Sequence, residues 1–233
     1  MVSVVLPAYN ERRNVLALIQ EIHEVLRNVS HEILIVDDDS SDGTLSAVEG
    51  LSDPCVKVFV RREDKGLAKA IRHGIERAHG ETLVVMDSDF NHPPQYIPLM
   101  LDALRTHDCV SGSRFLSGGG MLSPWHLFFT RWFNVFVRWV IRGRILDNSY
   151  GFYGIRKEAV GVLDFDKIFW GHGDYCIRLM YYLQKRGVSI LEIPIVNGLR
   201  RYGRPNRQYI RNFCRYFGEV LKLVFKEQVR CAG

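Results

Sequence analysis

Short apolar strands alternate with helix-like segments through the first 112 residues, and this alternation constrains the fold more than any other feature of the sequence. Residues 2–7 (VSVVLP) form a β-branched run that a proline ends, and residues 14–27 repeat apolar side chains at helical spacing. The same patterns predict strands over 32–37, 56–60, 82–87 and 108–112, and helices over about 42–51, 66–79 and about 94–106. Strands that alternate with helices favour a mainly parallel sheet covered on both faces, so we expect an α/β fold.

The length of the chain suits one large domain with a small extension. The chain has 233 residues, of which 47% are hydrophobic, and contains neither an internal repeat nor a low-complexity linker. We therefore expect one domain over residues 1–206, followed by a basic amphipathic helix and tail over residues 207–233. The five cysteines form no CxxC pair, and with no recognisable signal peptide this pattern predicts reduced thiols and a cytoplasmic location.

Basic side chains are most prominent in the second half of the chain. The net charge is +5, yet the acidic clusters lie within residues 1–110, whereas residues 111–230 carry arginines among aromatic side chains. This distribution indicates an anionic partner, for which nucleic acid and a membrane surface are the two candidates. Nucleic-acid binding gives no reason for acidic clusters at strand ends, so we favour the membrane.

Two segments have the pattern of helices that lie on a membrane surface. Arginines interrupt the most apolar run, 127–141, so no stretch reaches the roughly 20 apolar residues that cross a bilayer. In that run and in residues 207–226, basic side chains accompany apolar ones. For residues 207–226, packing on the protein's own sheet is an equally good interpretation. The sequence therefore predicts peripheral association with the cytoplasmic face of a membrane, directly or through a membrane-protein partner.

Carboxylates gather where two predicted strands end. The segments VDDDSSDGT (36–44) and VVMDSDFNHPP (84–94) both reach the carboxyl end of a strand, the edge at which open α/β sheets bind ligands. Turns and helix caps account for several of these residues, but adjacent carboxylates repel one another unless a cation or hydrogen-bond donors offset them. Nucleobase or ribose donors would do so at the first segment, and a hard divalent ion bridging a diphosphate at the second.

Seven segments together resemble one enzyme family. VSVVLPAYNE, IVDDDSSDGT, KGLAKAIRHGIERAHGE, VVMDSDFNHPP, GSRF, DNSYGFYGIRKEA and EIPI occur in the order seen in inverting family-two glycosyltransferases. The set is most similar to the dolichol-phosphate mannose synthase branch, which glycosylates polyprenyl phosphates with nucleotide sugars. The resemblance covers about residues 2–206, and the joint occurrence is far more specific than any one motif. It implies a single Rossmann-like domain of the glycosyltransferase A type.

The resemblance also implies roles for individual residues. The expected nucleotide-binding residues are Pro7, Ala8, Tyr9, Glu11, Asp37, Asp38 and Asp87. The expected ligands of a divalent cation, Mg²⁺ or Mn²⁺, are Asp87, Asp89 and Asn91. The expected catalytic residues are Asp89, Arg114, Arg131 and Arg200, with the arginines acting around the phosphates. The simpler alternatives are core packing for Tyr9 and, for each arginine, a surface position that covers apolar area. His92 is expected to be a hydrogen-bonding turn residue rather than a ligand, because Mg²⁺ and Mn²⁺ prefer oxygen.

The acceptor decides whether a general base is needed. A sugar hydroxyl must lose a proton as it attacks, whereas a phosphate monoester with a second pKa of about 6 is already largely dianionic near neutral pH. We therefore favour inverting transfer of a hexose, mannose or glucose, from a nucleoside-diphosphate sugar to a polyprenyl phosphate. If the acceptor is instead a sugar hydroxyl of a glycolipid or polysaccharide, Asp174 is the candidate base; its simpler role is an ion pair with Arg178. A nucleotide-sugar-binding subunit without chemistry of its own is a third alternative.

One segment departs from the pattern of the branch. The branch usually ends its R-x-x-G-x-S-K segment with serine and lysine, where this chain has Pro205 and Asn206. Contacts to the acceptor at this segment therefore depend on other residues, for which Arg201, Arg204 and Arg207 are the candidates.

Overall fold

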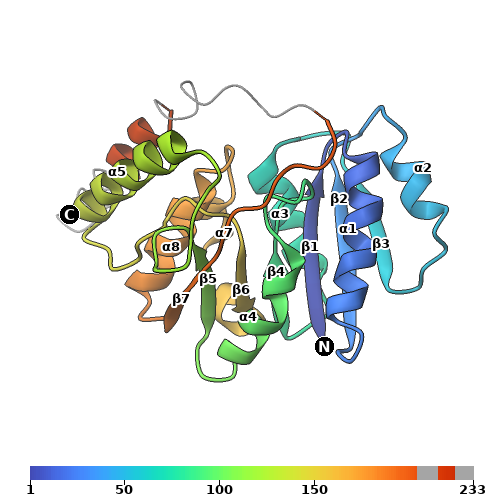
Figure 1. Ribbon diagram of the computed structural model, residues 1–233, viewed down its shortest axis with the longest axis horizontal. Helices are drawn as coiled ribbons and strands as arrows, with labels where there is room; N and C mark the ends of the chain where they lie inside the picture. Colours follow the sequence, from blue (N-terminus) through green and yellow to red (C-terminus); the bar gives the residue numbers. More distant parts are fainter. Residues whose placement is uncertain (204–214, 224–233) are drawn as a thin grey trace.

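The computed structural model describes residues 1–203 and 215–223 (Figure 1). In this part of the chain seven strands form one sheet, in the order β3-β2-β1-β4-β6-β5-β7. The strands are β1 (Val2–Ala8), β2 (His31–Asp37), β3 (Val56–Val60), β4 (Thr82–Val85), β5 (Cys109–Ser113), β6 (Tyr153–Arg156) and β7 (Ile190–Pro194). All neighbouring strands run parallel except β6, which is antiparallel to both β4 and β5. The expected α/β fold with a mainly parallel sheet is confirmed.

Helices cover both faces of the sheet, as the buried side chains of its strands require. Val4 and Leu6 of β1 belong to one apolar core, whereas Val5 between them belongs to the other. The first core is covered by α1 (Arg12–Val25), α2 (Thr44–Glu49) and α4 (Ile97–Ala103), the last preceded by the 3₁₀ turn η1 (Pro94–Tyr96). The second is covered by α3 (Leu67–Arg77), α6 (Lys157–Gly161), α7 (Phe165–Ile168) and α8 (Tyr175–Lys185).

The segment that follows β7 crosses the carboxyl edge of the sheet. Figure 1 shows this crossing segment, residues 195–203, running from β7 towards α1. The backbone N–H of Gly198 donates to the carbonyl of Asn91 (2.9 Å), and the backbone N–H of Tyr202 donates to Asn14 Oδ1 (3.1 Å) on α1. The loops after β1, β2 and β4 therefore share their edge of the sheet with a segment from the far end of the domain.

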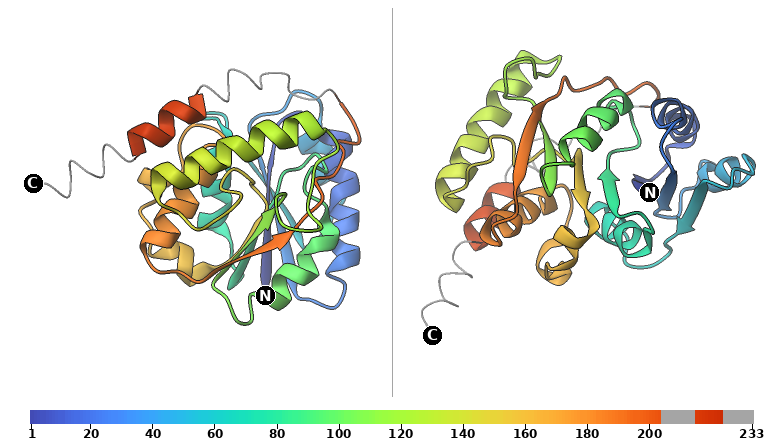
Figure 2. Two further views of the ribbon diagram at one scale, coloured as in Figure 1. Left: turned by 60° about the vertical axis from the view of Figure 1, so that its left-hand side comes forward. Right: turned by 90° about the horizontal axis from the view of Figure 1, so that it is seen from below.

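The longest helix, α5 (Pro124–Ile141), lies outside the two main layers. A third apolar cluster joins Phe133, Val137 and Ile141 of α5 to Ile177 of α8 and to Val220. Val220 belongs to residues 215–223, which are helical and lie beside α5 in Figure 2, with the rings of Phe136 and Phe217 stacked 4.3 Å apart. This described part of the predicted helix 207–226 thus packs on the protein, against α5 and α8 rather than on the sheet.

The rest of the predicted helix, residues 207–214 and 224–226, lies outside the described residues, as do Arg204, Pro205 and Asn206. The predicted boundary between residues 206 and 207 falls there too and stays a prediction. Among the helices within residues 1–203 and 215–223, none combines the length and apolarity that crossing a bilayer would need.

Candidate active site

The loops after β1 and β2 are tied together by Asn10. Its backbone N–H donates to Ser40 Oγ (2.8 Å), and its Oδ1 accepts from the backbone N–H of Ser41 (2.9 Å). Pro7 and Ala8 end β1 within this arrangement, and Ala8 pairs with Asp37 in the strand register. Tyr9 is 60% exposed, so core packing does not explain it, and its ring is free to stack on a planar group.

Asp37, the last residue of β2, points one unsatisfied carboxylate oxygen into the protein. Oδ1 accepts from the backbone N–H of Ser40 (3.2 Å) and from its hydroxyl, whereas Oδ2 is buried without a hydrogen-bond partner. Burial raises the pKa of this carboxyl, against the opposing hydrogen bonds from Ser40. Because Oδ2 is enclosed by the protein and Oδ1 is paired with Ser40, the predicted ribose contact of Asp37 stays a prediction.

Asp38 has its own partners in the loop between β3 and α3. Arg61 Nη1 donates to one oxygen (2.8 Å) and the backbone N–H of Gly66 donates to the other (2.6 Å). Burial raises the pKa of Asp38, while Gly66 and Arg61 oppose the shift. Asp38 therefore fixes the loop 61–66 at the edge of the predicted nucleotide site. Its predicted contact with the nucleobase stays a prediction.

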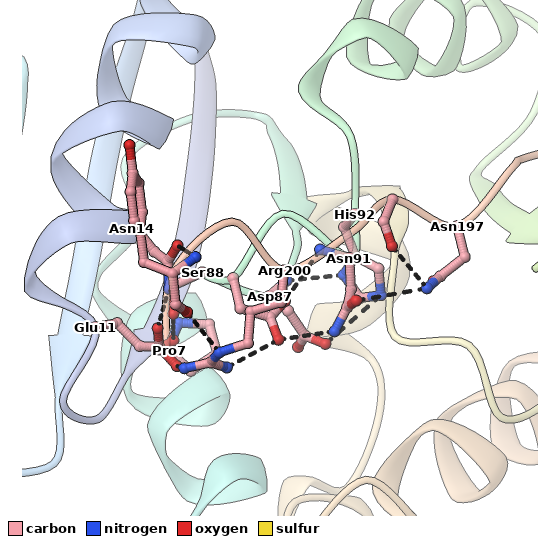
Figure 3. Close-up of polar contacts among 12 residues, drawn as sticks. Pro7, Glu11, Asn14, Asp87, Ser88, Asn91, His92, Asn197 and Arg200 are labelled. Atoms are coloured by element: carbon pink, nitrogen blue, oxygen red, sulfur yellow. Dashed lines mark hydrogen bonds and ion pairs between the residues drawn. The ribbon is translucent and has the colours of Figure 1, made fainter. Parts of the chain in front are cut away.

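The loop after β4 carries the expected cation ligands (Figure 3). Asp87 has 41% of its side-chain surface accessible, and desolvation by the surrounding atoms raises its pKa to about 6. Asp89 is less accessible, and burial together with the nearby Asp87 charge raises its pKa as well. Asn91 donates its backbone N–H to Asp89 Oδ1 (3.0 Å) and its amide Nδ2 to Asp89 Oδ2 (2.7 Å).

This donor set fits a hard divalent cation. Two carboxylates and one amide are the oxygen ligands that Mg²⁺ and Mn²⁺ prefer. The described residues contain no group of three or more His, Cys, Asp or Glu side chains placed to hold a metal alone, so diphosphate oxygens would complete the shell. Asn91 turns its amide nitrogen towards Asp89, so its oxygen becomes a ligand only if the amide rotates.

Arg200 of the crossing segment joins the nucleotide and cation parts of the site. Its Nη2 contacts Glu11 Oε1 (2.5 Å), its Nη1 contacts Asp89 Oδ2 (3.2 Å), and its Nε donates to the Tyr202 carbonyl (2.8 Å). Burial raises the pKa of Glu11, while hydrogen bonds from Asn14 and Arg200 oppose the shift. In Figure 3 the Arg200 side chain reaches Glu11, and its contacts offset the negative charge of Glu11 and Asp89.

Arg114, at the end of β5, is buried in an ion pair with Asp147. Nε and Nη2 donate to the two Asp147 oxygens (2.7 and 2.8 Å), and the backbone N–H donates to Oδ2 (3.1 Å). Nη2 also donates to Ser149 Oγ (3.0 Å), and within the described residues the one hydrogen bond of Nη1 goes to the Met121 sulfur (3.8 Å). In this arrangement the Nη1 edge is the part of Arg114 left for a phosphate, and its predicted contact stays a prediction.

Arg131 lies on the exposed side of α5. Its predicted role around the phosphates stays a prediction. Asn134, one turn further along, is buried and donates from Nδ2 to Ser149 Oγ (2.9 Å). Through Ser149 the helix is therefore connected to the Arg114 guanidinium.

Asp174, the candidate base, is enclosed at the start of α8. It is 2% exposed, and Oδ2 is paired with Arg178 Nη1 (2.5 Å). Its Oδ1 accepts from the backbone N–H of His172 (2.9 Å). Arg178 in turn donates to the carbonyls of Ile168 and Trp170. The simpler role, an ion pair at helical spacing, is the one that the structure displays.

The amino-acid sequence of the chain matches a known protein family. The family described as Glycosyl transferase family 2 matches residues 3–163, more than half of the chain. The chain belongs to this family. The family 2 match includes β1, β2 and β4 and therefore most of the acidic residues described above.

Relatives of this family 2 chain include enzymes named for a lipid phosphate. A dolichol-phosphate mannosyltransferase of Pyrococcus furiosus is 31% identical over 96% of this chain and 66% of its own length. One of Saccharomyces cerevisiae is 31% identical over 67% of this chain and 61% of its own length. A polyprenol monophosphomannose synthase of Mycolicibacterium smegmatis is 32% identical over 86% of this chain and 78% of its own length. The chain thus spans somewhat less than two thirds of the length of the first two relatives.

Solved structures support the fold assignment. Glucosyl-3-phosphoglycerate synthase of Mycobacterium tuberculosis, in complex with Mn²⁺, UDP and glucosyl-3-phosphoglycerate, is similar with a TM-score of 0.73 and 20% identity. The similarity covers 95% of this chain and 78% of that chain. The expected glycosyltransferase A-type domain is therefore confirmed as the fold of this family 2 member.

Local sequence patterns did not predict the residues that hold the site residues in place. Arg61 pairs with Asp38, Asp147 with Arg114, and Asn197 Nδ2 reaches Asn91 Oδ1 at 3.5 Å. One of them had a usable signal: Arg61 directly follows β3, which neighbours β2, so the parallel register places it beside the end of β2. Asp147 and Asn197 lie in loops whose positions no local pattern predicts.

Proposed function

We propose that this family 2 glycosyltransferase moves a hexose, mannose or glucose, from a nucleoside-diphosphate sugar to a polyprenyl phosphate, inverting the anomeric configuration. The names of its relatives support both the sugar and the acceptor, since they are dolichol-phosphate, polyprenol and undecaprenyl-phosphate mannosyltransferases. The acidic edge formed by Glu11, Asp37, Asp87 and Asp89 supports a donor that brings hydroxyl groups and a cation-bound diphosphate.

The observation that carries the choice of acceptor is the enclosure of Asp174. A general base must reach the hydroxyl from which it takes a proton, but both oxygens of Asp174 already have partners and the residue is 2% exposed. A phosphate monoester needs no such base, because it is already largely ionised near neutral pH. Transfer to a sugar hydroxyl is thus less well supported than transfer to a lipid phosphate.

The side chains at the edge would bind and orient rather than transfer protons. Tyr9 would stack on the nucleobase, Asp37 would accept from the ribose, and Arg200 would exchange its carboxylate partners for diphosphate oxygens. Arg114 and Arg131 would contact the lipid phosphate and hold its oxygen in line with the anomeric carbon.

The proposed cofactor is a divalent cation held by Asp87, Asp89 and Asn91. When bound, Mg²⁺ or Mn²⁺ would offset the negative charge that develops on the departing nucleoside diphosphate. The structurally similar synthase was solved in complex with Mn²⁺ and UDP and in complex with Mg²⁺ and UDP, and this supports the proposed cation.

The exposed side of α5 supports peripheral attachment to a membrane. It presents large apolar side chains to solvent: Trp125, Phe128, Phe129, Trp132, Val135 and Trp139. Arg131 lies among them, and the opposite side of the same helix is buried against α8 and residue 220. Aromatic rings with interspersed arginines are typical of helices that lie in the interfacial region of a bilayer, here proposed to be on the cytoplasmic face.

Transfer of label tests the proposal directly. The full chain is incubated with labelled GDP-mannose or UDP-glucose, Mn²⁺ or Mg²⁺, and a polyprenyl phosphate in detergent. We expect label to move into the organic phase with one donor, and the product to have the anomeric configuration opposite to that of the donor. Retention of configuration, or label that moves only to added oligosaccharides, would overturn the proposal.

A further inference from the structure

His92 belongs to the loop of the proposed cation ligands, but its ring lies inside the protein. It is 3% exposed, and its Nδ1 accepts a hydrogen bond from the backbone N–H of Asp87 (2.8 Å). The ring stacks on Phe152 with centroids 5.2 Å apart, and Tyr150 packs edge-on at 4.7 Å. Figure 3 shows His92 beside Asn91 in this loop.

The accepted hydrogen bond fixes where the ring carries its hydrogen. A nitrogen that accepts from an N–H group has no proton of its own, so the hydrogen of the neutral imidazole is on Nε2. Nε2 lies 3.7 Å from Asp87 Oδ2. The His92 ring therefore faces Asp87 with both nitrogens. Its Nδ1 accepts from the Asp87 backbone N–H, and its Nε2–H faces the Asp87 carboxylate.

Packing alone does not explain a histidine at this position. A phenylalanine would fill the same space between Phe152 and Tyr150, but it would leave the Asp87 N–H without its acceptor and would remove the ring N–H that faces the carboxylate. The 3.7 Å separation is longer than a hydrogen bond, and a movement of the accessible carboxylate by less than about 1 Å would close it.

We propose that His92 is a positioning residue that holds the Asp87 carboxylate in the orientation a divalent cation requires. Once the carboxylate moves within hydrogen-bond distance, Nε2–H would hold Oδ2 of Asp87, while Nδ1 anchors the backbone of the same residue. Donors of this kind, behind a metal ligand, change metal affinity by about 10- to 100-fold when they are removed. The inference rests on the proposed function only in assuming a cation at Asp87 and Asp89.

Two substitutions test the roles of the His92 nitrogens Nδ1 and Nε2 separately. In His92→Asn the side-chain oxygen keeps an acceptor near the position of Nδ1 but provides no donor at Nε2, and in His92→Gln the amide N–H keeps a donor near Nε2. Tyr150→Phe is the matched control, because it removes the hydroxyl that donates to the Asn91 carbonyl (3.3 Å) in the same loop and leaves Asp87 untouched.

The measurements are the affinity of the full chain for Mn²⁺ by electron paramagnetic resonance, the affinity for GDP and UDP in the presence of a chelator, and the melting temperature. We expect His92→Asn to bind Mn²⁺ at least about tenfold more weakly. His92→Gln should retain most of the wild-type Mn²⁺ affinity, and Tyr150→Phe all of it. Metal-free nucleotide affinity should stay within about twofold in every variant.

Mn²⁺ affinity that is unchanged in a folded His92→Asn variant would overturn the inference. So would a parallel loss of Mn²⁺ affinity and metal-free nucleotide affinity, because that pattern indicates a general distortion of the loop. Neither readout involves the acceptor, so an error in the proposed acceptor would leave these results unchanged and would appear only in the transfer assay.

Discussion

At the scale of single residues, Glu32 links the stability of the fold to pH. This buried carboxylate lies at the amino end of β2 and accepts hydrogen bonds from Ser3 Oγ (2.7 Å), the His79 backbone N–H (2.7 Å) and Lys57 Nζ (2.9 Å). Burial alone would raise the pKa of Glu32, but the hydrogen bonds from His79, Ser3 and Lys57 outweigh it and lower the pKa to about 2.

A carboxyl whose pKa is lower in the folded state stabilises the fold above its unfolded pKa and loses that contribution as pH falls. We therefore expect Glu32 to contribute roughly 1–3 kcal/mol at neutral pH, and this contribution to fade between about pH 4.5 and pH 2. Urea unfolding at several pH values checks this. In Glu32→Gln the free energy of unfolding should be lower at neutral pH, and the difference from wild type should shrink below pH 4; a difference independent of pH would contradict the account.

Arg200 gives a second prediction, because its guanidinium offsets two carboxylates that a bound cation would also offset. Arg200→Gln should lower the melting temperature in chelator, since Glu11 and Asp89 then repel one another and lose their counter-charge. Added Mn²⁺ should recover much of this loss by binding the carboxylates. Arg72→Gln is the control, because Arg72 also pairs with two carboxylates, Glu76 and Asp166, outside the site. Equal behaviour of the two variants would contradict the role given to Arg200.

The sequence predicted the positions of some site residues but not the pairs that other site residues form. The predicted strands placed Asp37, which ends β2, and Asp87, which follows β4 by two residues, correctly at one edge, because the end of a parallel strand can be located from local sequence. The pairing of Arg114 with Asp147 spans 33 residues, and that of Arg200 with Glu11 spans 189. The two residues of each pair meet only in the folded protein, so the local spacing of residues does not predict the pair.

At the scale of secondary-structure elements, α5 has two sides with opposite predicted roles. Replacing Trp132 and Trp139 by alanine removes two exposed rings, 61% and 78% accessible, so we expect little change in stability and at least about tenfold weaker binding to anionic vesicles. Sedimentation with phosphatidylglycerol vesicles measures this. Phe133→Ala, on the buried side, should instead cost about 3–5 kcal/mol of stability. Unchanged vesicle binding in the double variant would contradict a membrane role for α5.

The start of α8 gives a prediction that separates folding from catalysis. Asp174→Asn leaves the buried Arg178 charge without its partner, which should cost roughly 3–5 kcal/mol of stability. Transfer to a polyprenyl phosphate, normalised to the folded fraction, should remain within a few-fold of wild type, because no base is required. A loss of several orders of magnitude per folded molecule would identify Asp174 as a base and the acceptor as a hydroxyl.

Local patterns predicted the elements up to residue 112 well, and the later ones less completely. The strand expected over 56–60 was predicted with its bounds, whereas the strand expected over 82–87 ends at Val85, where the chain turns into the loop that carries Asp87. The antiparallel strand β6 was not predicted. Its four residues follow a loop that Asn134 and Asp147 hold in place, so its direction is set by tertiary contacts.

At the scale of the whole molecule, the proposed function requires two surfaces, the acidic edge of the sheet and the exposed side of α5, to serve the same transfer reaction. The acidic edge of the sheet would bind the donor, and α5 would hold the protein at the membrane from which the acceptor comes. Asn134, Ser149 and Arg114 connect the two through hydrogen bonds of 2.9 and 3.0 Å. These parts are brought together by the strand order of the sheet, in which β6 lies between β4 and β5. The alternation of strands and helices along the sequence could not predict this order.

The central claim is that the acceptor is a phosphate and therefore needs no general base. The most direct test compares the rate of nucleoside diphosphate release with a polyprenyl phosphate and with the unphosphorylated polyprenol of the same chain length, at equal donor and Mn²⁺ concentrations. The account predicts release that requires the phosphate and is close to background with the alcohol. Equal rates with both lipids, or release that only an added sugar acceptor stimulates, would contradict it.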